Sequence, residues 1–244
     1  MENFLTVVEV ARCLGLSIPE TEKVLRKSGL RCAFVSGTQR FQRDELLHWL
    51  EVHFGSLTVD RLRTVDYSNA STAGLDPSKQ YVSGLLEANI HPMVAARTRS
   101  SLLRSLAGLA CATGLTWDEA ALYDQLCERE DAVSTALPNG VAFPHPREIR
   151  KIYLEGDVLI LARTPSPIPF GAPGGRLSGL FFLLLFPSPS VHLHVLARLS
   201  RMVREEALVR KLCDASDEAE MLDAIRSAES GIVSVAAKDS VRRQ

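Results

Sequence analysis

The chain has 244 residues, which suits one large or two modest domains, and its hydrophobic fraction of 46% is ordinary for a protein with a buried core. Its 28 Lys and Arg residues nearly balance its 29 Asp and Glu residues, which excludes a bulk electrostatic grip on nucleic acid and leaves only a local basic face. The five cysteines form no C-x-x-C pair, which argues against a disulfide framework and a cysteine zinc site.

Reduced thiols suit a cytoplasmic protein, and two further observations agree with that location. The first residues lack a basic stretch followed by an apolar run, so no signal peptide is expected. The longest apolar run, Leu180–Phe186, is too short to span a bilayer and predicts a buried strand. We therefore expect no insertion into a membrane.

Residues 1–54 predict a small domain of short helices and one hairpin. Thr6-x-x-Glu9 and Ser17-x-x-Glu20 are capping boxes, which open helices over 7–14 and 17–27. Two short helices joined by a turn with Gly15 are typical of a helix-turn-helix. A hairpin around Ser36-Gly37-Thr38 is expected over 31–41, and a third helix over 44–53.

Residues 55–80 are polar, show little periodicity and predict a linker. From Tyr81 the chain alternates helices and strands, which predicts an α/β domain over 81–232, a mixed sheet flanked by helices, followed by a tail over 233–244. The expected strands are 141–143, 158–162 and 180–186. The expected helices are 98–111, 116–127 (capped by Thr116-x-x-Glu119), 191–205, 207–213 and 217–228.

The chemistry of this domain is concentrated between Arg129 and His145. Pro144 and Pro146 flank His145 and stiffen the backbone, so its imidazole is expected in one orientation. His192 follows Ser190, a predicted cap, at the start of a helix whose free N–H groups favour an anion. A histidine, an arginine and a helix N-terminus together suit phosphoryl transfer to an imidazole nitrogen.

Three ordered motifs carry a family resemblance over about residues 80–230. They are Arg129-Glu130…Ser134-Thr135…Asn139-Gly140-Val141-Ala142-Phe143-Pro144-His145, then Pro169-Phe170-Gly171-Ala172-Pro173, then His192-Leu193-x-x-Leu196-Ala197-x-Leu199. They resemble IIA domains of the bacterial phosphoenolpyruvate-dependent phosphotransferase system, of the fructose/mannitol and nitrogen-regulatory type.

The resemblance implies roles for four residues. His145 is the residue phosphorylated by a histidine-containing phosphocarrier protein, His192 assists beside the phosphoryl group, Arg129 helps to bind it, and Thr135 borders the site. The chain departs from the family pattern at Pro138, where the family usually has a glycine-rich stretch, and at Pro146. No family role falls on His194.

Residues 1–54 resemble excisionase-like, MerR-related winged helix-turn-helix domains. The resemblance lies in the opening Leu5-Thr6-Val7-Val8-Glu9-Val10-Ala11 and in Gly37-x-x-Arg40-Phe41-x-Arg43-Asp44-Glu45-Leu46-x-x-Trp49-Leu50. It implies DNA contacts that position the protein without specifying sequence. The candidates for them are Lys23, Arg26, Lys27, Arg40 and Arg43. Glu20 and Glu22 on the second helix weaken the case for DNA binding, and a protein-interaction module that has lost DNA binding is the alternative.

The first hypothesis is therefore a regulator that carries a phosphohistidine rather than a turnover enzyme, with no cofactor and no metal. Its partners are the phosphocarrier, DNA, and a permease component or regulatory protein. Three alternatives stay open: a IIA-like binding or sensor module that is not phosphorylated, a IIA component of sugar transport, and a transcription factor that works through its N-terminal domain. A metal pair of His192 and His194 is a further alternative, although no ligand partner stands at suitable spacing.

Overall fold

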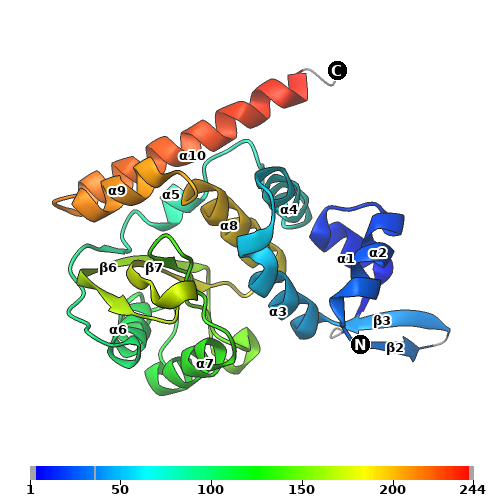
Figure 1. Cartoon of the computed structure of the whole chain (residues 1–244), viewed down its shortest axis with the longest axis horizontal. Helices are drawn as coiled ribbons and strands as arrows, with labels where there is room; N and C mark the ends of the chain where they lie inside the picture. The colour runs from blue at the N-terminus through cyan, green and yellow to red at the C-terminus, as the bar shows by residue number, and fades with distance from the viewer. Residues whose placement is uncertain (1–3, 36, 242–244) are drawn as a thin grey trace. The chain divides into compact units, whose positions relative to one another are not determined.

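The structure is a computed structural model that describes residues 4–35 and 37–241 (Figure 1). Its contacts divide the chain into two compact units. We call 1–77 with 188–200 the N-terminal unit, and 78–187 with 201–244 the sheet unit. One short stretch, Ser188–Ser200, thus belongs by its contacts to the N-terminal unit although it follows most of the sheet unit in sequence.

The first helices of the N-terminal unit begin and end where their caps predict. The Glu9 side chain accepts from the Thr6 backbone N–H at 2.7 Å, and the Thr6 hydroxyl accepts from the Glu9 N–H at 3.2 Å. The second capping box joins Ser17 and Glu20, as predicted. Gly15 ends the first helix with φ of 60°, a left-handed conformation that favours glycine. The elements are β1 (Phe4–Thr6), α1 (Val7–Leu14) and α2 (Ile18–Ser28).

The predicted hairpin and third helix follow. Strand β3 (Thr38–Gln42) pairs antiparallel with both β2 (Cys32–Val35) and β1, so the sheet order is β1-β3-β2. Ser36 of the predicted turn lies outside the described residues. Helix α3 (Arg43–His53) buries Leu46 and Leu50 at helical spacing.

The predicted linker is wrong in one respect, because 55–80 contains a helix of its own. The 3-10 turn η1 (Phe54–Ser56) is followed by α4 (Val59–Thr72), whose cap Thr58 accepts from the Arg61 N–H at 3.3 Å. The polar composition that indicated a linker is partly buried and paired. Asn69 is 1% exposed, and its amide donates to the carbonyls of Cys13 and Val65, both at 2.8 Å.

Helix α8 (Pro189–Met202) begins earlier than predicted. Its first hydrogen bonds come from Ser188, whose carbonyl accepts from the His192 N–H at 3.0 Å and whose hydroxyl accepts from the Val191 N–H at 3.5 Å. Ser190 therefore lies inside the first turn and is not the cap. The prolines before and at the helix start permit this, since a missing N–H costs nothing in a first turn.

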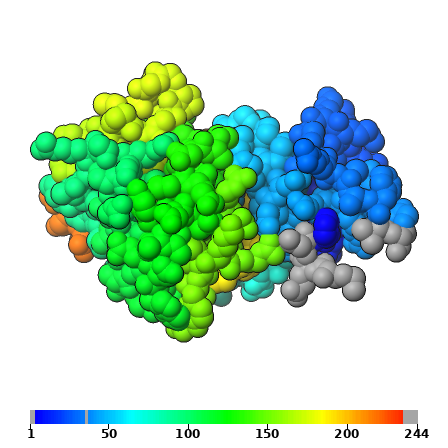
Figure 2. All heavy atoms as spheres, turned by 90° about the horizontal axis from the view of Figure 1, so that it is seen from below, coloured from blue at the N-terminus to red at the C-terminus, as the bar shows by residue number. Residues whose placement is uncertain are grey.

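The sheet unit has the predicted mixed sheet between helices, with strand order β4-β6-β7-β5. Strands β6 and β7 are antiparallel, while β4 pairs parallel with β6, and β5 parallel with β7. Their residues alternate little between polar and apolar, as expected for strands covered on both faces. Figure 1 shows α6 and α7 on one side of the sheet and α5, α9 and α10 on the other, and the green atoms in Figure 2 show the α6 and α7 side. The strands are β4 (Ile90–His91), β5 (Val141–Ala142), β6 (Val158–Pro169) and β7 (Leu177–Leu185).

Several boundaries in this unit differ from prediction. Helix α7 is capped by Asp118, which accepts from the Ala121 N–H at 2.9 Å, and Thr116, the predicted cap, is instead buried. Helix α10 continues past residue 232, where a tail was predicted. The helices are α5 (Val82–Leu85), α6 (Arg99–Ala112), α7 (Glu119–Ala132), α9 (Glu206–Asp214) and α10 (Glu218–Val241), with 3-10 turns η2 (Ile149–Lys151) and η3 (Pro173–Gly175). Among the described residues, no helix is both long enough and apolar enough to cross a membrane.

Candidate functional site

His145 follows the buried strand β5 and is itself 3% exposed. The strand is anchored where the Pro144 carbonyl accepts from the Leu184 N–H of β7 at 3.0 Å. The Nδ1 atom of His145 lies 2.8 Å from the Phe143 carbonyl oxygen. A carbonyl only accepts, so Nδ1 carries the proton and, in the neutral ring, Nε2 is the nitrogen with the accepting lone pair. The local backbone thus selects one tautomer.

Arg129, which the sequence placed at the same site, contacts His145. It lies in the last turn of α7 and is 2% exposed. Its Nε–H donates to His145 Nε2 at 2.9 Å, and its Nη1 donates to the Val133 carbonyl at 2.6 Å. A guanidinium is only a donor, which agrees with an Nε2 that accepts. The structure therefore brings a fixed cation to the nitrogen that holds the lone pair.

Thr135 is held at the border of this pair by Glu130, a residue to which sequence reasoning gave no role. The Glu130 carboxylate accepts from the Thr135 N–H at 3.0 Å and from the Thr135 hydroxyl. The Thr135 carbonyl accepts in turn from the Phe143 N–H at 3.4 Å. Burial raises the pKa of Glu130, and the hydrogen bonds from Thr135 and the nearby Arg129 offset only part of that rise. The signal in the sequence was an acid beside Arg129, five residues before Thr135.

A glycine explains why the second motif belongs to the site. Gly171 has φ of 114°, and a Cβ there would stand 2.8 Å from the Ser134 side chain. Ser134 uses the space to donate its hydroxyl hydrogen to the Phe170 carbonyl at 3.2 Å. The segment from Phe170 therefore packs directly on the Ser134–Thr135 loop, and only glycine fits at the contact.

The two prolines that depart from the family pattern leave this arrangement intact. Pro138 stands in a turn closed by hydrogen bonds from the Leu137 N–H to the Val141 carbonyl at 2.7 Å and from the Gly140 N–H to the Leu137 carbonyl at 3.3 Å. Neither bond uses the N–H that a proline lacks. After Pro146, the Arg147 N–H donates to the Gln125 carbonyl of α7 at 3.2 Å.

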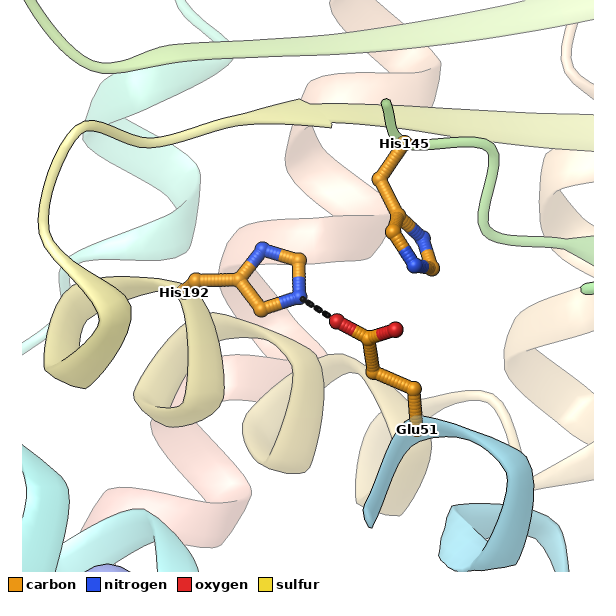
Figure 3. A group of neighbouring side chains, drawn as sticks. All are labelled: Glu51, His145 and His192. Atoms are coloured by element: carbon orange, nitrogen blue, oxygen red, sulfur yellow. Dashed lines mark ion pairs between the residues drawn. The ribbon is translucent and has the colours of Figure 1, made fainter. Parts of the chain in front are cut away.

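His192, on α8, pairs with a carboxylate that the sequence did not indicate. Its Nε2 lies 3.1 Å from Glu51 Oε1 of α3, and the two side chains are 12% and 10% exposed (Figure 3). Glu51 lies on the predicted third helix, one residue past the end of the motif quoted for it, so no pattern in the sequence singled it out. That His192 assists at a phosphoryl group stays a prediction.

His194 is part of a separate buried cluster in the N-terminal unit. Its Nδ1 lies 2.6 Å from Asp66 of α4, and Arg198 Nε lies 3.5 Å from the other oxygen of the same carboxylate. Arg198 also donates to the Pro77 carbonyl at 2.8 Å. Because His192 and His194 face different carboxylates, the alternative of a two-histidine metal pair loses its support.

The five basic candidates for DNA contact fall into two groups. Lys23, Arg26 and Lys27 are exposed on α2. Arg40 and Arg43 are only half-exposed. Hydrogen bonds from Thr6 lower the pKa of Glu9, and the charges of Arg40 and Arg43 add to that effect, so these two arginines face an acid of their own domain.

The fold and the site define an α/β domain built around a buried histidine that is held in one tautomer by an arginine and a backbone carbonyl. The family model for the phosphoenolpyruvate-dependent sugar phosphotransferase system, EIIA 2, matches residues 85–228. The chain belongs to this EIIA family. The match covers Arg129, Thr135, His145 and His192, and it begins after the N-terminal helices.

Relatives agree with the family. A nitrogen regulatory protein of Bradyrhizobium diazoefficiens is 33% identical over 133 residues, 52% of this chain and 82% of the relative. A fructose-specific EIIA component of the phosphotransferase system from Haloferax volcanii is 28% identical over 130 residues, with the same two shares. The crystal structure of nitrogen regulatory protein IIA-Ntr from Neisseria meningitidis matches with a TM-score of 0.53 and 25% identity, covering 59% of this chain and 97% of that one.

Proposed function

We propose that this protein is a regulatory phosphoacceptor, in which His145 Nε2 receives a phosphoryl group from a histidine-containing phosphocarrier protein. The observation that carries the proposal is the tautomer of His145. Its Nδ1–H is engaged by the Phe143 carbonyl at 2.8 Å, which leaves the Nε2 lone pair as the nucleophile. Membership of the EIIA family supports the same role.

The transfer is balanced without a cofactor. The Nε2 lone pair attacks phosphorus in line, the bond from phosphorus to the donor's nitrogen breaks, and its electrons return to that nitrogen. As Nε2 attacks, the hydrogen bond from the Arg129 Nε–H to Nε2 breaks and this N–H donates to a phosphoryl oxygen instead, while His192 donates an N–H to another. Both groups spread the charge on the equatorial oxygens. Burial strengthens these interactions because little water competes for the donors.

The EIIA family match is compatible with a regulatory role and with a role in sugar transport. The presence of an N-terminal unit favours the regulatory role. The relatives include both nitrogen regulatory proteins and a fructose-specific component. A domain joined to a phosphoacceptor offers a way to report phosphorylation, since the added charge changes which contacts are favourable. A sugar-transport component is the alternative.

Labelling tests the proposal. The protein is incubated with radioactive phosphoenolpyruvate, the first enzyme of the system and the phosphocarrier, and we expect an acid-labile, base-stable label on the wild type. The label should vanish in His145→Ala and persist in His91→Asn, a half-buried histidine of the same unit. If the wild type stays unlabelled while a known EIIA domain in the same mixture is labelled, the chain is a binding module. Undiminished label on His145→Ala would exclude His145 as the acceptor.

A second proposal concerns residues 1–54, for which we infer DNA binding. The supporting observation is that Lys23, Arg26 and Lys27 are all exposed on α2, the second of two helices joined by a short turn. We expect salt-sensitive binding to genomic fragments that weakens in Arg26→Ala and not in Glu22→Ala on the same helix. No binding at low salt would favour a protein-interaction module instead.

A further inference from the structure

Both nitrogens of His145 belong to one closed circuit of contacts, whose members all lie within the sheet unit. From Nδ1 the circuit passes to the Phe143 carbonyl at 2.8 Å. The Phe143 N–H donates to the Thr135 carbonyl at 3.4 Å, and the Thr135 N–H donates to the Glu130 carboxylate at 3.0 Å. Glu130 follows Arg129 in the chain, and the Arg129 Nε–H returns to His145 Nε2 at 2.9 Å. The circuit therefore links both sides of the imidazole to a single carboxylate.

The circuit crosses an irregular segment, Val133–Thr135, between α7 and β5. Segments outside helices and strands are generally more mobile than the elements that they connect. This one also supports the arginine, because the Val133 carbonyl accepts from Arg129 Nη1 at 2.6 Å. Glu130 fastens its far end twice, by accepting from the N–H and from the hydroxyl of Thr135. The position of the segment, and with it the support of Arg129, therefore depends on Glu130.

Glu130 occupies a place where a carboxyl group is costly. It is 2% exposed. Burial raises its pKa, even though the hydrogen bonds from Thr135 and the charge of Arg129 act against the rise. Buried groups of this kind are concentrated at functional sites, where the geometry they impose outweighs their cost in stability.

We propose that Glu130 is a positioning residue for the phosphorylation of His145. By holding Thr135, it keeps the Phe143 carbonyl on Nδ1, so that Nε2 retains the lone pair. By holding the same segment, it keeps the guanidinium of Arg129 where the phosphoryl group arrives. The inference rests on the proposed function, in which Nε2 is the nucleophile. In this role Glu130 acts through Thr135 and not on the phosphoryl group itself.

The hydrogen-bond pattern distinguishes a role in position from a role in charge. In Glu130→Gln the amide carbonyl can accept from the Thr135 N–H, while the amide nitrogen donates to the Thr135 hydroxyl, which can also accept. In Glu130→Ala neither partner is present. Glu130→Gln should therefore keep the circuit closed without the charge, and Glu130→Ala should open it.

Labelling of the full chain over a range of phosphocarrier concentrations tests the proposal. Glu130→Ala should lower the saturating rate at least about tenfold, because small displacements of reacting groups cost this much or more. The carrier concentration that gives half of the saturating rate should not change, since Glu130 is buried. Glu130→Gln should label at close to the wild-type rate, and so should the control Asp124→Ala, exposed on the same helix. A saturating rate in Glu130→Gln as low as in Glu130→Ala would overturn the proposal, because charge would then be what matters.

A spectroscopic measurement tests the circuit without phosphorylation. Nitrogen–proton correlation spectra of the imidazole groups, at a pH where the ring is neutral, show which nitrogen of His145 carries the proton. The wild type and Glu130→Gln should carry it on Nδ1, and Glu130→Ala should show both tautomers. If Glu130→Ala does not fold, Thr135→Val removes the hydroxyl donor alone and should show the same change to a lesser degree.

An unchanged tautomer together with a wild-type saturating rate, in a variant that unfolding curves show to be folded, would overturn the proposal. Failure of the phosphoacceptor role is recognised separately. The wild type would then take no label, while the tautomer of His145 would still show whether Glu130 holds the circuit.

Discussion

Glu229 of α10 is expected to contribute strongly to the stability of the sheet unit through the start of α5. One carboxylate oxygen accepts from the backbone N–H groups of Tyr81 and Val82, at 2.8 and 2.9 Å. The other accepts from the N–H and the hydroxyl of Ser83, at 2.9 and 2.8 Å. The side chain joins residues almost 150 positions apart, and Glu229 has no exposed surface (0%).

Replacing Glu229 by Gln keeps the shape and removes one acceptor. The amide nitrogen then faces two donors, and each buried donor left without an acceptor costs about 1–3 kcal/mol. The Ser83 hydroxyl can rotate toward another acceptor. For two donors we therefore expect a loss in the lower half of the combined range, about 2–4 kcal/mol of unfolding free energy. That is a large fraction of the 5–15 kcal/mol typical of a domain.

Urea unfolding at pH 7 followed by circular dichroism measures this loss, with Asp223→Asn as the control. Asp223 is exposed on the same helix, and its contact with Arg226 spans 3.7 Å, so its removal should change stability by less than about 0.5 kcal/mol. A Glu229→Gln variant within 1 kcal/mol of the wild type would refute the reasoning.

The pH dependence gives an independent check. Burial alone would raise the pKa of Glu229, but the hydrogen bonds from Tyr81, Ser83 and Val82 outweigh it and bring the pKa below its ordinary value of 4.5. A lowered pKa means stability that is present above 4.5 and lost as the pH falls through the folded value. The gap between wild type and Glu229→Gln should therefore narrow below pH 4.5, and a gap that stays constant would contradict the assignment.

Two further predictions concern the site. Arg129→Lys keeps a charge, but a lysine cannot contact His145 and the Val133 carbonyl together. Losing one charge-assisted hydrogen bond of about 1.5–3 kcal/mol should slow labelling about 10- to 150-fold. Labelling at the wild-type rate would show that the two contacts of the guanidinium are not needed. For Glu130, burial raises the pKa above 4.5, so its ionisation lowers stability as the pH rises through the folded value. Glu130→Gln should therefore lose more stability, relative to the wild type, at pH 4.5 than at pH 7, as urea midpoints at the two pH values can show.

Local signals explain most of what the sequence predicted. The capping boxes at Thr6 and Ser17 and the apolar runs of β6 and β7 depend on neighbours in the chain, and the structure has all of them. Arg129 and His145 are 16 residues apart, yet their pairing was predictable because the family motif contains both. The predictions were weaker where polar residues, which usually indicate solvent exposure, are buried. Asp66 and Asn69 suggested a solvated linker, but they are buried in α4 with partners of their own.

Glu51 shows a different reason why part of a site escapes prediction from sequence. Glu45, on the same helix, looks equivalent in composition and periodicity, and only the position of α8 distinguishes the two. Glu130, by contrast, could have been inferred, since an acid next to a buried arginine needs donors and Thr135 is within reach. Residues that act within their own segment are therefore visible in a sequence, and residues contributed by another segment become visible only in the fold.

For the helix segment that carries His192, the family match and the contacts in the fold assign the same residues to different units. The family model places residues 188–200 with the phosphoacceptor domain, because its match over 85–228 includes them together with His145 and Arg129. Their contacts place them with α3 and α4, because Asp66 and Glu51 supply carboxylates to the histidines and arginine of α8.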